Sequence, residues 1–205
     1  KGWGDKGDVY YLQLIDNVRK FKGMSPPDRT SPPKSIRIGK PNQWENVTPV
    51  YNHYRGNTFH RDHAGRNNTY YINTTGRNDI VKAKVARDHR HLYFYVECAE
   101  KLTSHRDPNW MLLFIDIDRD KSTGWNGYDY IVNHQHPTSG KVIVEKNVGD
   151  RWEWKEVGKS SYVVKDNRLE VKIDRKMLNR MDKPLDFEFK WNDNMQENGN
   201  IMDFY

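Results

Sequence analysis

The amino-acid sequence predicts an all-β fold, namely an antiparallel β-sandwich preceded by one N-terminal helix and a proline-rich linker. Apolar and polar residues alternate with a period of two in many short runs after residue 34, and Gly, Asn and Asp separate those runs. Only one earlier segment has the 3.6-residue period of a helix. Short strands joined by tight turns without intervening helices are typical of a sandwich or barrel.

Residues 8–22 form the predicted helix. Asp8 suits the N-cap, Leu14, Val18 and Phe21 lie on one apolar face, and Gly23 offers a left-handed stop. A single amphipathic helix needs another body against which to bury its stripe. We therefore interpret residues 1–23 as the tail of a preceding catalytic domain, 24–33 as a Pro-rich linker and 34–205 as the sandwich.

The alternation gives the positions of the strands. In the first of them, for example, Val81, Ala83 and Val85 alternate with lysines. We expect strands at 81–86, 92–98, 111–115, 128–133, 141–147, 151–157, 161–165, 168–173 and 185–191. The Asn-rich stretch 52–79 is the least regular part of the chain.

Composition and charge argue against several classes of protein. The 34 Lys and Arg residues are interleaved with 28 Asp and Glu, without a dense basic run, so nucleic acid is not an expected partner. No run approaches the roughly 18 apolar residues of a membrane span. Cys98 is the one cysteine, so no intrachain disulfide can form.

A series of landmarks stands in a recognisable order along residues 34–205. The series comprises Trp44, Leu113-Phe114-Ile115-Asp116, Thr123-Gly124-Trp125, Tyr128-Asp129-Tyr130-Ile131-Val132-Asn133 and Phe189-Lys190-Trp191-Asn192-Asp193-Asn194. In this order the region resembles the family 9 carbohydrate-binding modules. The resemblance implies a non-catalytic β-sandwich that binds a polysaccharide or oligosaccharide. It also implies attachment to a barrel-type glycoside hydrolase and a secreted, periplasmic or cell-surface location.

One departure from the family concerns the sugar site. Leu112 and Ile131 stand where the family places polar groups on the inner strands, and neither can hydrogen-bond a hydroxyl. A glycan site in this chain would therefore have to differ from the usual one.

The candidate ligand-binding residues are Trp125, Asn126, Tyr128 and Asp129, which place two rings and two polar groups around one turn. Sugar rings stack on exposed aromatics, while amides and carboxylates bind hydroxyls. The alternative is that Trp125 folds back as a plug over the sandwich core. Trp152 and Trp154 leave the same choice open, since they share one face of a strand that is either a sugar-stacking strip or a core face.

Asp116, Asp118 and Asp120 are the candidate metal ligands. Alternate carboxylates at the end of a strand can converge on a hard cation such as calcium, although the glycine and glutamate of an EF-hand loop are missing. The alternative is that Asp116 caps backbone amides while the other two are solvated turn residues.

Catalytic motifs are lacking, since the sequence has no nucleophile elbow, zinc-binding helix or phosphate-binding glycine loop. The sequence therefore predicts no enzyme in this chain. It predicts a glycan-binding module that holds an attached hydrolase near its polysaccharide. The alternative is a structural accessory sandwich that packs on the catalytic domain and has no ligand of its own.

Overall fold

The protein is described by a computed structural model over residues 9–24, 29–56, 58, 60–64, 70–181 and 183–195. This part of the chain contains one helix, α1 (Val9–Phe21), and a series of strands. The strands are β1 (Val50–Asn52), β2 (Arg61–Ala64), β3 (Tyr70–Asn73), β4 (Ile80–Arg87), β5 (His91–Cys98), β6 (Leu112–Asp116), β7 (Tyr130–Val132), β8 (Lys141–Asn147), β9 (Trp154–Lys165), β10 (Arg168–Asp174) and β11 (Glu188–Asn192). The predicted all-β class is thereby confirmed.

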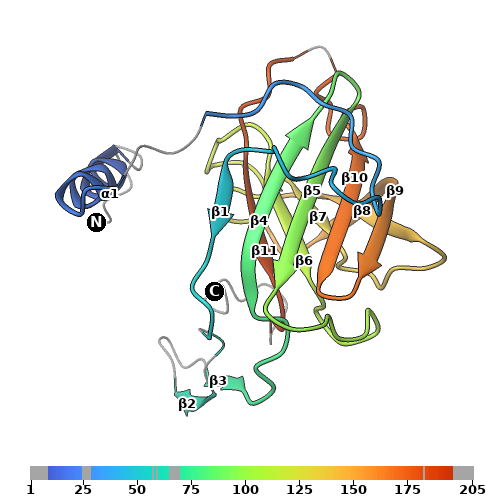
Figure 1. The fold of residues 1–205 in the computed structure, drawn as a ribbon. Helices are drawn as coiled ribbons and strands as arrows, with labels where there is room; N and C mark the ends of the chain where they lie inside the picture. Colours follow the sequence, from blue (N-terminus) through green and yellow to red (C-terminus); the bar gives the residue numbers. More distant parts are fainter. Residues whose placement is uncertain are drawn as a thin grey trace.

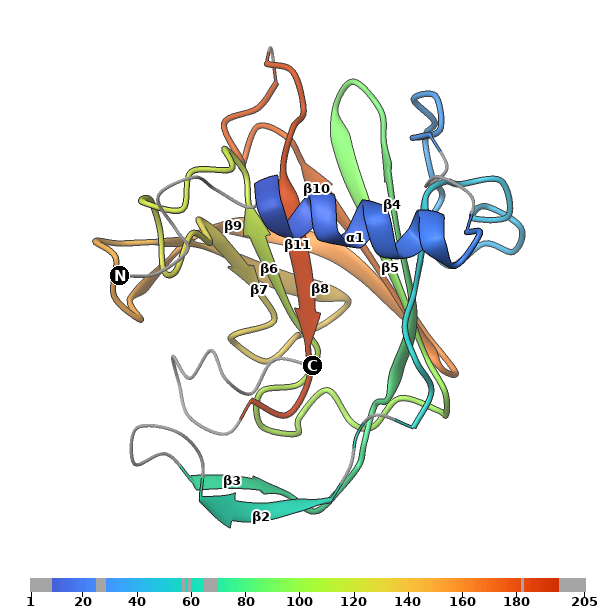
Figure 2. The ribbon, with the colours of Figure 1, turned by 90° about the vertical axis from the view of Figure 1, so that its left-hand side faces the viewer.

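Nine of these strands form one curled antiparallel sheet in the order β1-β4-β5-β10-β9-β8-β7-β6-β11 (Figure 1). The curl folds the sheet over on itself, so that β4, β5 and β10 face β6, β7 and β8 across a shared core. The hairpin of β2 and β3 pairs separately and extends away from the sheet (Figure 2).

The main core lies between the two layers. Alternate residues of β5, such as Leu92, Phe94 and Val96, meet Leu113 and Ile115 of β6 there, and all five are fully buried. The alternation read from the sequence is the physical cause, since successive side chains of a strand point to opposite faces.

Strand β9 joins the two layers and differs from the sequence prediction. We expected two strands, at 151–157 and 161–165, but the chain runs through as one. Residues 154–161 of β9 pair with β8, with a register shift opposite Val144 and Glu145, and residues 161–165 pair with β10. Gly158 allows the passage because a Cβ there would lie 3.0 Å from the sulfur of Met177.

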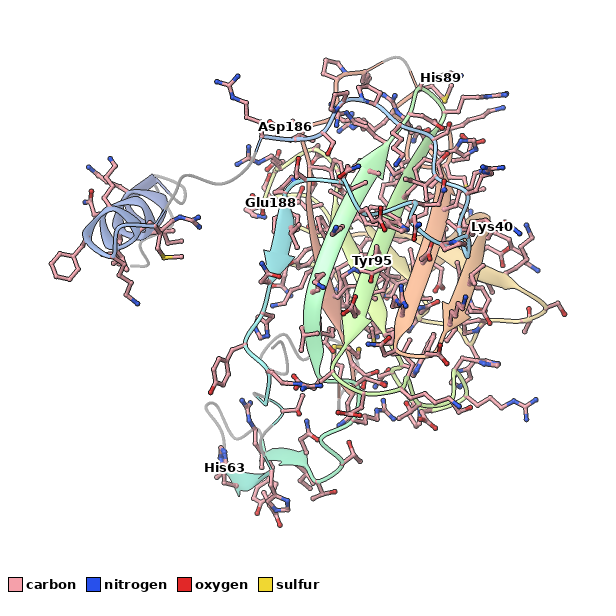
Figure 3. All side chains as sticks on the ribbon, viewed as in Figure 1. Lys40, His63, His89, Tyr95, Asp186 and Glu188 are labelled. Carbon is pink, nitrogen blue, oxygen red and sulfur yellow. The ribbon has the colours of Figure 1, made fainter. Side chains whose placement is uncertain are left out.

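A segment that we call the strap (residues 29–49) covers the outer face of β4, β5 and β10. Ile36, Trp44 and Val47 of the strap pack on Tyr93 and Tyr95 of β5. Figure 3 shows Tyr95 in the middle of this face. The strap includes the second half of the stretch that the sequence predicts as a linker.

Helix α1 stands apart from the sheet in Figure 1, and its apolar stripe is exposed at Leu14, Val18 and Phe21. The helix itself was predicted to within a residue at either end. Among the described residues, no helix is long and apolar enough to cross a membrane.

Candidate functional site

The predicted ligand-binding turn lies at the outer face of β6 and β7. Trp125 and Tyr128 exchange backbone hydrogen bonds of 3.0 and 2.9 Å across Asn126 and Gly127. Both central residues have positive φ, at 48° and 88°, which an Asn-Gly pair tolerates well. Gly124 is also required, because a Cβ there would lie 2.3 Å from the carbonyl oxygen of Tyr128.

Trp125 folds back against the sheet. Of the two alternatives, the structure therefore has the one in which Trp125 is a plug and not an exposed stacking ring. Its side chain is 5% exposed, and its ring centroid lies 5.6 Å from that of Phe114 and 4.7 Å from that of Trp152. A sugar ring cannot lie on Trp125 in this conformation.

Neighbouring rings extend this packing into what we call the outer aromatic cluster, made of Phe114, Trp125, Tyr128, Trp152 and Trp154. Its three outermost members, Tyr128, Trp152 and Trp154, are only partly buried. The indole N–H groups of Trp152 and Trp154 are buried and have no hydrogen-bond partner in the described part of the chain. The two tryptophans thus belong to neither the main core nor a flat exposed strip.

The polar residues of the turn separate from one another. Asn126 is exposed at the tip, and its side-chain amide makes no hydrogen bond to the residues that the structure describes. Asp129 is buried instead, and its Oδ2 accepts a 2.9 Å hydrogen bond from the backbone N–H of Ile117. Of the four predicted ligand-binding residues, Asn126 and Tyr128 are therefore the ones that a ligand could reach.

A buried polar group that the sequence did not indicate lies beside the cluster. Glu145 is 2% exposed, and its carboxylate lies 3.0 Å from both His134 Nδ1 and Gln135 Nε2. Burial alone would raise the pKa of Glu145, but the contacts with His134 and Gln135 lower it. The ring of His134 packs edge-on against Trp152, with a centroid distance of 5.5 Å.

The predicted metal ligands are brought together in part. Asp116, Asp118 and Asp129 each place one carboxylate oxygen within 4.8 Å of the others. Asp120 turns away, and its carboxylate accepts hydrogen bonds from the backbone N–H and the hydroxyl of Ser122. We call the set of Asp116, Asp118 and Asp129 the acidic cluster.

The three carboxylates repel one another. Burial raises the pKa of Asp129, and the charges of Asp118 and Asp116 raise it further. Lys121 compensates from one side, where its Nζ lies 2.7 Å from both Asp116 Oδ2 and Glu188 Oε2. Three carboxylates with the nearby Thr123 hydroxyl could hold a hard divalent cation such as calcium, with further oxygen ligands from water.

The acidic cluster is the one group of three or more potential metal ligands found among the described residues.

Comparisons with protein-family models, with curated proteins and with solved structures find no match to this chain. The fold class therefore rests on the structure itself, and function has to be argued from the residues.

Proposed function

We propose that this chain is a non-catalytic carbohydrate-binding module that targets or supports an attached glycoside hydrolase. The sugar-contacting surface would be the rim of the outer aromatic cluster, formed by Tyr128, Trp152 and Trp154, with Asn126 at the tip of the turn.

The observation that carries this proposal is a group of aromatic rings on the outside of the second layer. The outward face of a sandwich strand is usually polar, whereas here it bears Phe114 and the rings packed over it. Partly exposed aromatic rings offer flat apolar surfaces to the C–H faces of sugars. The exposed amide of Asn126 adds a donor and an acceptor for a hydroxyl.

Trp125 has a supporting role in this arrangement. Because it packs behind the rim, between Phe114 and Trp152, it fixes the orientation of the outer rings. A Trp125→Ala variant would therefore lose packing as well as binding, and the rim residues are better targets for an experiment.

The test is a glycan-array screen of the chain, followed by affinity electrophoresis on any polysaccharide that binds. Trp152→Ala and Trp154→Ala should each weaken binding about tenfold, equivalent to roughly 1.4 kcal/mol. Trp152→Phe keeps a ring and should retain most of the affinity. Asn126→Gly suits the same positive φ and removes only the amide, so it should weaken binding without unfolding the turn.

Tyr54→Ala is the matched control, since Tyr54 is 77% exposed and lies outside the cluster. Binding that falls equally in Tyr54→Ala, or that survives both tryptophan variants, would exclude the rim as the sugar site.

The second candidate function is a structural accessory sandwich that packs on a catalytic domain. The burial of Trp125 and the apolar residues Leu112 and Ile131 beneath the cluster favour it. A blank array from protein with a cooperative melting transition would support this second function. The rim would then be the surface that contacts the neighbouring domain.

A further inference from the structure

The two ends of the curled sheet come to face each other. Among the residues that the structure describes, β1 pairs only with β4 and β11 only with β6, so each is an edge of the nine-stranded sheet. Figure 1 shows the two edges on the same side of the molecule. The ring of Tyr51 on β1 reaches the ring of Phe189 on β11, edge to face, at a centroid distance of 5.4 Å.

A groove separates these two edges. Its larger part is a cavity of about 450 Å³ between residues 51–53 and 80–83 on one side and 187–193 on the other. A second cavity of about 220 Å³ continues it along 85–87 and 185–189. Both cavities share Tyr51, Phe187 and Phe189 as lining, so together they follow the length of β4 and β11. We call this space the edge groove.

Within the described part of the chain, the backbone of β1 makes no hydrogen bond on the groove side. The N–H of His53 donates a 2.9 Å hydrogen bond to Val81 O. Because alternate residues of a strand point their backbone groups to opposite sides, Tyr51 also faces β4. The N–H and C=O groups of Val50 and Asn52 therefore face the groove.

The same reasoning applies to β11. Ile115 O accepts a 3.0 Å hydrogen bond from Asp129 N–H, so the backbone of Ile115 faces the β7 side of β6. The alternate residues Phe114 and Asp116 consequently face β11, where they pair with Lys190 and Glu188. This leaves the backbone groups of Phe189 and Trp191 facing the groove from the opposite wall.

The side chains along the groove also alternate. Phe189 and Trp191 pack into the main core, and Tyr51, although 47% exposed, lies against Phe189. By the alternation of strand side chains, Asn52, Glu188 and Lys190 lie on the outer side. The indole N–H of Trp191 is buried and has no partner among the described residues. A buried donor of this kind costs free energy unless a ligand or water supplies an acceptor.

We propose that the edge groove binds an extended peptide strand of a partner polypeptide, which pairs with β1 and β11 and closes the curled sheet. Backbone groups on both walls favour a polypeptide over a sugar or a lipid, since only a strand offers donors and acceptors at the spacing of a β-ladder on both of its edges. Strands β1 and β11 do not pair with each other among the described residues, and the two cavities are lined by residues of both edges.

The groove specifies the pattern of the peptide. Apolar side chains at alternate positions would face the interior side and lie against the contacting rings of Tyr51 and Phe189. The intervening side chains would face solvent near Lys190, whose burial lowers its pKa to about 8. An acidic residue at such a position would stabilise the charged form of Lys190. This inference does not rest on the proposed carbohydrate site, whose rim is formed by Tyr128, Trp152 and Trp154 and not by the two edge strands.

The experiment uses a synthetic nonapeptide of alternating valine and glutamate, acetylated and amidated at its ends, titrated into the full chain. We expect saturable binding by calorimetry. In amide hydrogen exchange, we expect at least tenfold slower exchange at Val50, Asn52, Phe189 and Trp191, whose N–H groups would enter the new ladders. Tyr51 N–H already faces β4 and serves as the internal control, with little change.

Two matched changes separate a strand from other modes of binding. The same peptide with alternate amides N-methylated keeps its side chains but cannot complete both ladders, and it should bind at least tenfold more weakly. Asn52→Pro removes an N–H that faces the groove and spares the hydrogen bonds to β4, so it should weaken peptide binding while the melting transition stays cooperative. Trp191→Phe, which keeps the core ring, tests the indole donor in the same way.

Several results would overturn the proposal. They are equal affinity for the N-methylated peptide, unchanged exchange at the four amides, or no binding at millimolar peptide. A chain that dimerises through the groove, shown by light scattering and lost in Asn52→Pro, would identify a second copy as the occupant instead.

Discussion

The two outer faces of the curled sheet are covered in different ways. On the first layer the strap lies over Tyr93 and Tyr95, and two hydrogen bonds of Trp44 join it to the sheet. Trp44 Nε1 donates to Glu170 Oε2 at 2.9 Å, and Lys84 Nζ donates to Trp44 O at 2.7 Å. On the second layer, the rings of the outer aromatic cluster cover the sheet, and two of their indole donors have no partner among the described residues.

This difference indicates which face is available for binding. A buried donor without a partner costs free energy, and on the strap face the buried indole donor of Trp44 is bonded to Glu170. The strap face is therefore structural, whereas the aromatic face keeps unused hydrogen-bonding groups and partly exposed rings. The predictions below test this contrast.

The largest expected effect comes from replacing tryptophan with phenylalanine on each face. Trp44→Phe removes a donor that is bonded to the buried Glu170 carboxylate, and should lower the free energy of unfolding by roughly 3 kcal/mol. Trp152→Phe removes a donor that has no partner, and should cost about 1 kcal/mol or less. Urea denaturation of both variants measures the difference. Equal losses would remove the contrast between the two faces.

The next effect concerns the acid stability of the strap face. Asp88 accepts hydrogen bonds from Ser35 Oγ at 2.6 Å and from Tyr93 OH and the backbone N–H groups of Arg90 and His91 at 2.7 Å each. Burial alone would raise the pKa of Asp88, but these four hydrogen bonds hold it well below its ordinary value of 3.8.

The sign of the pH dependence follows from this lowered pKa. Asp88 contributes stability above pH 4, and the contribution is lost as the pH falls toward the pKa of the folded state. Asp88→Asn should lower the free energy of unfolding by roughly 2 kcal/mol at pH 7. When the melting temperature is measured from pH 7 to pH 2, its acid limb should be flatter in the variant than in the wild type. An unchanged acid limb would show that Asp88 does not hold the strap in place.

The sequence predicted most of the strands because one face of each is buried, and burial leaves a period-two pattern. It predicted two strands, at 151–157 and 161–165, where the structure has the single strand β9, which contains Gly158. Only the packing of Met177 against that glycine and the register shift in β8 make the strand continuous, and neither has a local signal. The edge groove was missed for a similar reason, since it depends on the curl of the whole sheet.

The sequence predicted which residues make up the candidate site better than it predicted how they are arranged. Asp129 was assigned to sugar binding because it follows Tyr128, yet it joins the acidic cluster. The pairing of Ile115 with Tyr130 places Asp116 and Asp129 side by side on neighbouring strands, and this register is invisible in one sequence. For Trp125, the apolar run Met111–Ile115 was the available signal, since a strand that is apolar on both sides needs a cover on its outer face.

The smallest effect tests the acidic cluster. With a chelator present, Asp129→Asn should stabilise the protein by about 1 kcal/mol, because it removes one of three mutually repelling carboxylates while its amide oxygen can still accept from Ile117 N–H. The raised pKa of Asp129 predicts the same sign. Ionised Asp129 costs stability at neutral pH, and the cost disappears as the pH falls through the raised pKa.

Calcium should reverse the order of stability of the wild-type chain and Asp129→Asn. If the cluster binds the ion, the wild-type chain gains about 2.7 kcal/mol at a hundredfold excess of calcium over the dissociation constant, while Asp129→Asn gains less. Asp120→Asn is the control, because Asp120 bonds Ser122 and lies outside the cluster, so its response to calcium should match the wild type. Melting curves that calcium and chelator leave unchanged would mean that the cluster holds no cation. Lys121 would then be its only counter-charge among the described residues, and Asp129→Asn should remain the more stable protein in every buffer.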